Sequence, residues 1–268
     1  MRGRLTRWLI LAMLIVGSIF AAMMMMEVAL RLAGISYPSF YEFDPHRGLS
    51  RHRPGAEGWA TSEGKAYIKI NSDGLRDREH TLRKPPGTLR IAVLGDSSAE
   101  AFQVDADKAF WAVMQRQLGQ CEALGGRGVE AINFGVSGYG TADELLTLRE
   151  DVWKYDPDIV LLAFLVGNDV RNNSFALEGD PYRPYYVIQN GQLELRSAPG
   201  TSSRPKFFTS MRHWLVAHSR VAQLVNYVRG LIYVPESERA PPAAAAFGVQ
   251  RLEEKIYREP QDNAWQDA

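Results

Sequence analysis

Cysteine is almost absent from this chain, in which Cys121 stands alone among 268 residues. A single thiol excludes an intramolecular disulfide and says little about the redox compartment. Net charge is absent too, because 31 basic residues balance 31 acidic ones. A neutral chain has no general attraction for nucleic acid, so no nucleic-acid partner is expected. The apolar and charged fractions, 46% and 23%, are those of a globular protein with a packed core.

Charge is missing altogether from one long stretch near the N-terminus. The mostly apolar run from Trp8 to Met26 follows three arginines and ends before Glu27. At about 1.5 Å per residue this run nearly matches a hydrocarbon core of about 30 Å. We expect residues 1–31 to anchor the chain in the inner (cytoplasmic) membrane as a single span, with the arginines inside and the rest exported. A cleaved signal peptide is the alternative, although no A-x-A-like site precedes Met26.

The remainder divides by composition into an arm and a domain. Residues 32–87 are rich in glycine, proline and charge, with one strand-like stretch at 66–70, and we interpret them as a connecting arm. Residues 88–268 are expected to form an α/β domain. Within it, 235–246 (PESERAPPAAAA) is of low complexity and is expected to be a mobile loop.

Apolar runs alternate with helical spacing at the start of this domain. The candidate strands are 89–94 (LRIAVL), 129–134 (VEAINF) and 159–164 (IVLLAF), and the intervening candidate helices are 109–118 and 142–153. Near-continuous apolar strands separated by helices indicate a parallel sheet covered on both faces. The expected fold class is therefore α/β, a three-layer doubly wound parallel sheet with the first strand in the centre.

Two further elements are expected beyond the third strand. Residues 185–196 are expected to form a hairpin that turns at Asn190-Gly191. Residues 207–228 have the pattern of one long amphipathic helix.

A polar, glycine-rich turn lies at the end of each candidate strand, and these turns contain Ser97, Gly138 and Asn168. In open α/β sheets, ligands bind beyond the carboxyl ends of the strands. A serine at such a turn can act as a nucleophile, while a glycine N–H and an asparagine amide can bind the developing oxyanion. Each residue alone is better explained as a turn residue or helix cap. Their joint order predicts acyl transfer.

The same segments resemble the conserved blocks of SGNH/GDSL hydrolases. The segment IAVLGDSSAEAF resembles the first block, with Ser97 at the position of the nucleophile. The segment INFGVSGYGT resembles the second block, with Gly138 at the position of the oxyanion glycine. The segment FLVGND resembles the third block, with Asn168 at the position of the oxyanion asparagine. The upstream INSDGLRDRE is similar to membrane-tethered members, so the resemblance covers roughly residues 70–173. Ser98 departs from the hydrophobic residue usual after the nucleophile. The resemblance implies a flavodoxin-like fold and a Ser97 acyl-enzyme.

Two other serine sites are alternatives. The segment 95–99 (GDSSA) approximates the nucleophile elbow of α/β-hydrolases, but that elbow normally follows several earlier strands. Ser137 lies beside Gly138, and we interpret it as structural.

The resemblance also implies an Asp-x-x-His segment near the C-terminus, after two further strands, which would supply the base and the acid that orients it. Only His80 has an aspartate, Asp77, three residues earlier, and this pair precedes the nucleophile. His213 and His218 are expected to pack or cap on the helix. We therefore expect a C-terminally truncated chain, itself inactive, whose catalytic histidine and aspartate lie beyond residue 268.

The implied function is hydrolysis of ester bonds in a small-molecule or glycan substrate, with glycan O-acetyl groups suggested by analogy alone. An O-acyltransferase would use the same residues, and a non-catalytic glycan-binding or assembly protein of the same fold is a third possibility. No metal cluster or phosphate loop is visible, and Gly135, Gly138 and Gly140 have the wrong spacing for a dinucleotide fingerprint. No cofactor or metal is therefore expected, and the oligomeric state is left open.

Overall fold

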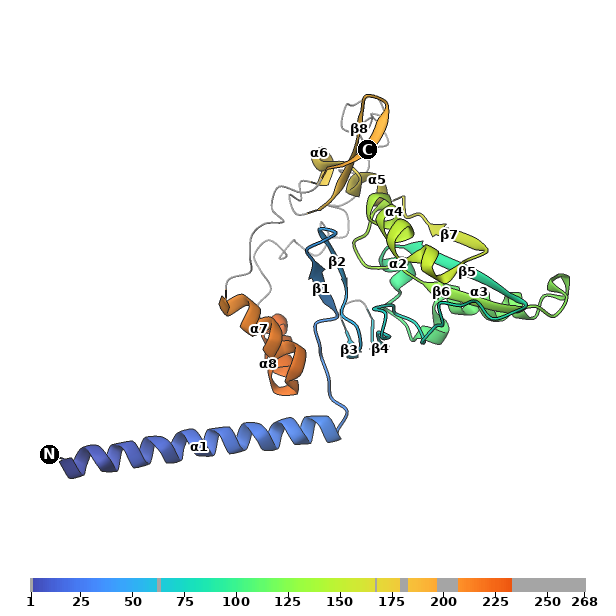
Figure 1. Ribbon diagram of the computed structural model, residues 1–268. Helices are drawn as coiled ribbons and strands as arrows, with labels where there is room; N and C mark the ends of the chain where they lie inside the picture. The colour runs from blue at the N-terminus through green and yellow to red at the C-terminus, as the bar shows by residue number, and fades with distance from the viewer. Residues whose placement is uncertain (1, 62–63, 167, 179–182, 197–206, 233–268) are drawn as a thin grey trace, which may run out of the picture. The chain divides into compact units, whose positions relative to one another are not determined.

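A computed structural model of the chain describes residues 2–61, 64–166, 168–178, 183–196 and 207–232 (Figure 1). These residues fall into two compact units, a smaller one of residues 2–39 with 207–232 and a larger one of residues 40–196. The segment 235–246, expected to be a mobile loop, lies outside the described residues.

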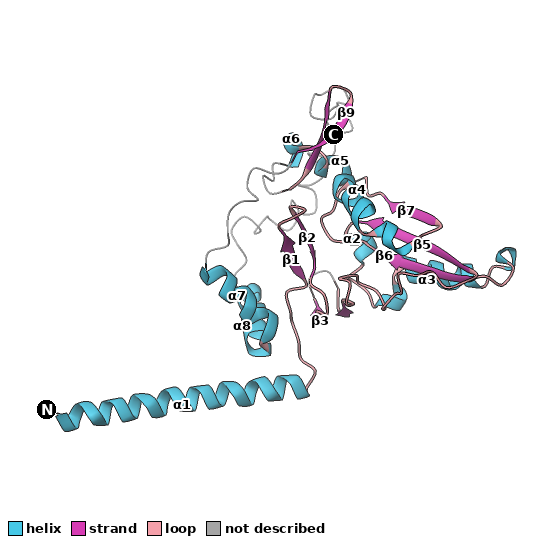
Figure 2. Ribbon diagram, in the orientation of Figure 1, coloured by secondary structure: helices cyan, strands magenta, loops and turns pink. Residues whose placement is uncertain are grey.

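A three-stranded parallel sheet forms the centre of the larger unit (Figure 2). Its spatial order is β6 (Gly128–Asn133), β5 (Thr88–Gly95) and β7 (Ile159–Ala163). All three expected strands are present within a residue or so of their expected ends, and the first is central. The mixed α/β class with a parallel sheet is thus confirmed.

Helices follow each strand of the sheet. In chain order they are α2 (Ser97–Glu100), η1 (Ala106–Lys108), α3 (Phe110–Gly119), η2 (Glu122–Leu124), α4 (Thr141–Glu150), η3 (Val152–Tyr155), α5 (Asp169–Asn172) and α6 (Phe175–Glu178).

Alternate residues of β5 enter two separate apolar cores. Val93 packs in a cluster with Trp111 of α3, whereas Leu94 packs in a cluster with Val152 of η3. Successive side chains of a strand point to opposite faces of the sheet. Helical segments therefore cover both faces of β5, as its unbroken run of apolar residues predicts.

The outer edge of the sheet is apolar. In the part of the chain that the structure describes, β7 pairs with β5 alone. Its side chains Ile159 and Leu162 remain 46% and 42% exposed. Folded domains normally cover or charge such an edge.

The region expected to be a connecting arm packs with the sheet from Phe40 onward. It contains two antiparallel hairpins, β1 (Tyr41–Asp44) with β2 (Leu49–His52), and β3 (Glu57–Ala60) with β4 (Ala66–Lys69). Only β4 coincides with the expected strand. The domain thus begins well before residue 88. Composition does not reveal this because the attachment is polar: Arg76, only 1% exposed, donates to the carbonyls of Glu100 and Val104, in and after α2.

The hairpin expected over 185–196 is confirmed as β8 (Tyr185–Gln189) and β9 (Gln192–Arg196). Asn190 and Gly191 have φ values of 52° and 75°. Two successive positive φ angles are what a two-residue type I′ turn requires, and Asn-Gly is the dipeptide that adopts them most readily.

The smaller unit begins with α1 (Arg2–Leu32), one continuous helix. Residues Thr6–Leu32 are long and apolar enough to cross a membrane, a property that a signal sequence shares. The expectation of one helix over 207–228 is wrong, because the chain forms α7 (Phe207–His218) and α8 (Arg220–Ile232). The break is at Ser219, whose hydroxyl accepts a hydrogen bond from Ala222 N (3.2 Å) as the N-cap of α8.

Candidate active site

Ser97 lies at the carboxyl end of the central strand. β5 ends at Gly95, and Asp96 caps α2 by accepting a hydrogen bond from Ser98 N at Oδ1 (2.9 Å). Ser97 is the first residue of α2 and is partly buried. This is where an α/β sheet presents residues to a ligand, because the crossovers to the two neighbouring strands diverge here.

Two glycines allow the turns after the strands to touch. A Cβ at Gly135, after β6, would lie 2.5 Å from Ala99 Cβ in α2. A Cβ at Gly140 would lie 2.6 Å from Asn172 Cβ in α5. Neither approach is possible for a larger residue without a shift. The second turn is therefore in contact with both the first and the third.

Asn168 extends from the third turn to the first. Its Nδ2 donates a hydrogen bond to Asp96 Oδ2 (3.0 Å), the residue directly before Ser97. An amide nitrogen carries two hydrogens, so one remains for another acceptor. The structure thus brings Asn168 to the Ser97 turn.

Gly138 is held by bonds on either side of it. Ser137 N donates to Glu100 Oε1 (3.1 Å), and Tyr139 Oη donates to Ser50 O (2.8 Å). The Arg183 side chain donates to the carbonyl of Gly138. Gly138 itself has a φ of 81° and an unobstructed Cβ direction, so its own backbone remains approachable. In the part of the chain described, no hydrogen bond occupies its N–H.

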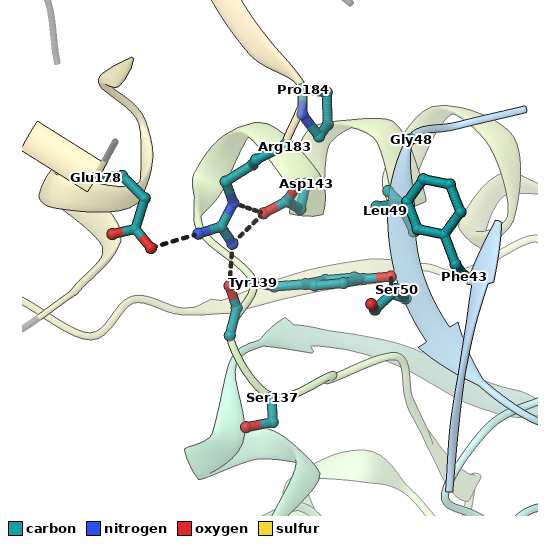
Figure 3. Close-up of a pocket in the computed structure, with 11 residues that line it drawn as sticks. Phe43, Gly48, Leu49, Ser50, Ser137, Tyr139, Asp143, Glu178, Arg183 and Pro184 are labelled. Carbon is teal, nitrogen blue, oxygen red and sulfur yellow. Dashed lines mark hydrogen bonds and ion pairs between the residues drawn. The ribbon is translucent and has the colours of Figure 1, made fainter. Parts of the chain in front are cut away.

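Figure 3 shows the pocket of about 330 Å³ that opens beside this loop. Arg183 points to Asp143, with Nη2 2.6 Å from Oδ2, and to Glu178 at 3.7 Å. Phe43, Leu49 and Pro184 supply apolar walls. The lining includes Gly138 but neither Ser97 nor Asn168. Convergence of all three groups on one acyl oxygen stays a prediction.

Glu100 was not anticipated from the sequence, although it is the central acceptor beneath the site. Its Oε1 accepts from Tyr41 Oη (2.8 Å) and lies 2.6 Å from His52 Nε2, in addition to the bond from Ser137 N. Glu100 is 2% exposed. A charged residue among alanines in DSSAEAF is the one sequence signal for it. Its partners Tyr41 and His52 lie more than forty positions upstream, and no motif in the sequence indicates that they contact Glu100.

Three of the described histidines, His52, His80 and His218, are bonded to residues other than Ser97. His52 Nδ1 is 3.3 Å from Gly74 O, so oxygen atoms face both of its ring nitrogens. His218 Nδ1 is 2.8 Å from Trp214 O. The side chain of His213 lies outside what the structure describes.

His80 lies beside β6. Its Nδ1 is 2.7 Å from Glu130 Oε1, and its Nε2 is 3.1 Å from Asp77 Oδ2. Glu130 is paired in register with Arg90. Asp77 Oδ2 in turn accepts a hydrogen bond from Asn133 N (2.9 Å), the last residue of β6. The Asp77–His80 pair is a buried structural contact.

Acidic side chains are buried behind the turns. Glu144 of α4 is 1% exposed, and neither carboxyl oxygen has a hydrogen-bond partner in the described part of the chain. Burial, with the charges of Asp169, Asp96 and Asp143, raises the pKa of Glu144 to about 8. Burial and the charge of Asp96 likewise raise the pKa of Asp169 to about 6, against a lowering bond from Leu165 N. Glu144 is therefore mostly neutral at pH 7.

No group of three or more His, Cys, Asp or Glu side chains could hold a metal ion within the described ranges. No protein-family model and no curated protein matches this chain.

Proposed function

We propose that this protein is a membrane-anchored serine ester hydrolase of the SGNH type, with a doubly wound flavodoxin-like sheet. Ser97 is the nucleophile, and Gly138 and Asn168 complete the oxyanion hole. The observation that carries the proposal is the hydrogen bond from Asn168 Nδ2 to Asp96 Oδ2 (3.0 Å). It joins the third polar turn to the residue beside the candidate nucleophile, at the carboxyl end of the central strand.

The chemistry follows from these positions. The Ser97 hydroxyl attacks the acyl carbon, and the carbonyl oxygen becomes an oxyanion. The N–H groups of Ser97 and Gly138 and the second amide hydrogen of Asn168 are the proposed donors to it. A base must take the Ser97 proton and return it to the leaving alcohol. His52, His80 and His218 are each bonded to residues other than Ser97, so we propose that another residue supplies the base.

The acyl-enzyme can pass its acyl group to water or to another hydroxyl. Hydrolase and O-acyltransferase share Ser97, Gly138 and Asn168, and a glycan ester is proposed as substrate by analogy. The engaged histidines also favour a second candidate, a non-catalytic glycan-binding or assembly protein. Enzyme activity separates this candidate from the first two.

An ester hydrolysis assay on the membrane-embedded protein, in a form that contains the residue supplying the base, tests the proposal. Ser97→Ala should remove the activity, leaving only residual acceleration. Ser137→Ala is the matched control, because Ser137 bonds to Glu100 through its backbone N–H and the substitution keeps that bond. Equal activity in the wild type and Ser97→Ala would contradict the proposal.

A further inference from the structure

The end of the apolar helix α1 is joined to the start of α8 through one carboxylate. Glu27 accepts hydrogen bonds from Ser219 Oγ (2.9 Å), Arg220 N (3.0 Å) and Val221 N (3.0 Å). It thereby pairs two of the backbone donors that every helix leaves free at its N-terminus. Arg31 Nη2 donates to His218 O (2.8 Å), so the preceding helix α7 is attached at the same point.

A second set of contacts lies just beyond the end of α1. Ser36 Oγ donates to Gln223 Oε1 (3.1 Å), and Gln223 is 3% exposed. The rings of Tyr37 and Tyr227 stack with centroids 4.0 Å apart. These contacts hold α8 at the level where the candidate membrane span ends.

Several large apolar side chains of α7 and α8 are exposed. On α8, Val225, Val228 and Ile232 lie at helical spacing on one face and are 63%, 41% and 76% exposed. Val225, Val228 and Ile232 also line an apolar groove of about 540 Å³. On α7, Trp214 is 60% exposed. Soluble surfaces rarely expose large apolar patches without a partner.

The charge of the same segment has one sign. Residues 207–232 contain Arg212, Arg220 and Arg229 and no aspartate or glutamate. Arginines beside an apolar helix face with an exposed tryptophan are typical of helices that lie in a membrane interface. Trp and Tyr rings are enriched at the headgroup level.

We propose that α7 and α8 lie in the interface of the membrane that α1 spans, with the apolar face of α8 at the acyl boundary and the arginines at anionic headgroups. The proposal rests on the membrane anchor and not on catalysis. If the proposal holds, residue 39, before the larger unit in the sequence, and residue 207, after it, both lie at the bilayer surface.

Depth-dependent quenching tests the proposal on the intact protein. It is reconstituted in vesicles of neutral and anionic phospholipid, with Cys121→Ser and one new cysteine that carries an environment-sensitive fluorophore. The label is placed at Val228→Cys or, as matched control, at Gln192→Cys on exposed β9. Shallow nitroxide lipids should quench the label at 228 about threefold more than the label at 192, while aqueous iodide should do the reverse. Arg229→Gln should reduce the lipid quenching at 228 only in anionic vesicles.

Each other outcome overturns the proposal in its own way. If the protein floats with the vesicles but iodide reaches both labels equally, α8 lies in water. If the label at 228 is shielded from iodide and from nitroxide lipid alike, protein covers this face. If the protein does not float with the vesicles, the anchor itself is wrong.

Discussion

At the scale of single residues, a substitution of Asn168 tests whether this side chain acts in catalysis or in substrate binding. Its amide is proposed to bind the oxyanion, which exists only during the reaction, so its loss should act on kcat. We expect Asn168→Ala to lower kcat by about 10²-fold to 10³-fold with little change in KM. Steady-state kinetics of the intact protein measures both. Gln189→Ala removes an exposed amide as control and should change neither. A rise in KM alone would assign Asn168 to substrate binding.

We expect the free energy of unfolding to depend on pH through the buried carboxyl group of Glu144. Its pKa rises from 4.5 to about 8 on folding, so the folded state keeps a proton that the unfolded chain loses. This contribution is fully present below about pH 4.5 and is lost as pH rises through about 8. We expect Glu144→Gln to match the wild type near about pH 5 and to be more stable by on the order of 4 kcal/mol near about pH 8.5, at about 1.4 kcal/mol per pH unit.

Thermal unfolding of both proteins in detergent at the two pH values measures this difference. Glu122→Gln changes an exposed carboxyl and should leave the pH dependence of the wild type unaltered. Equal unfolding temperatures for Glu144→Gln and the wild type at the higher pH would show that Glu144 ionises in the folded state as it does in water.

At the scale of elements, the sheet could be predicted and its attachments could not. β5, β6 and β7 are short apolar runs, and strands buried on both faces have that sequence pattern. Because the strands are parallel, the turns that follow them lie at the same edge of the sheet. Ser97, Gly138 and Asn168 could therefore be predicted as site residues from the sequence. The hairpins of residues 40–69 have no such pattern. They attach through buried polar contacts such as His52–Glu100, between residues far apart in the sequence.

The contact between α2 and the turn after β6 gives an element-scale prediction. A Cβ at Gly135 would lie 2.5 Å from Ala99 Cβ and 2.8 Å from Glu100 N. Gly135→Ala should therefore displace α2, cost about 1–3 kcal/mol of stability and reduce activity. Gly119→Ala is the control, because nothing lies within 4 Å of a Cβ at the end of α3. Equal unfolding free energies for the two variants would show that α2 does not need this close approach.

At the scale of the whole molecule, the chain joins a candidate membrane helix to an α/β unit that carries the proposed site. The arginines in the first turns of α1 predict that its N-terminus is cytoplasmic and that Ser97 lies on the outer side. A reporter that works only outside the cytoplasm should be active when it is fused after Pro38. Activity of a cytoplasm-only reporter would reverse the orientation, and release of soluble mature protein would favour a cleaved signal.

The central claim is that Ser97 is an activated nucleophile, and covalent labelling tests it most directly. The protein in its membrane, in a form that contains the residue supplying the base, is treated with a fluorophosphonate, digested and mapped by mass spectrometry. We predict one phosphonylated serine, Ser97, with labelling lost in Ser97→Ala and retained in Ser137→Ala. A folded protein that takes up no label, or that is labelled at a different serine, would contradict the account.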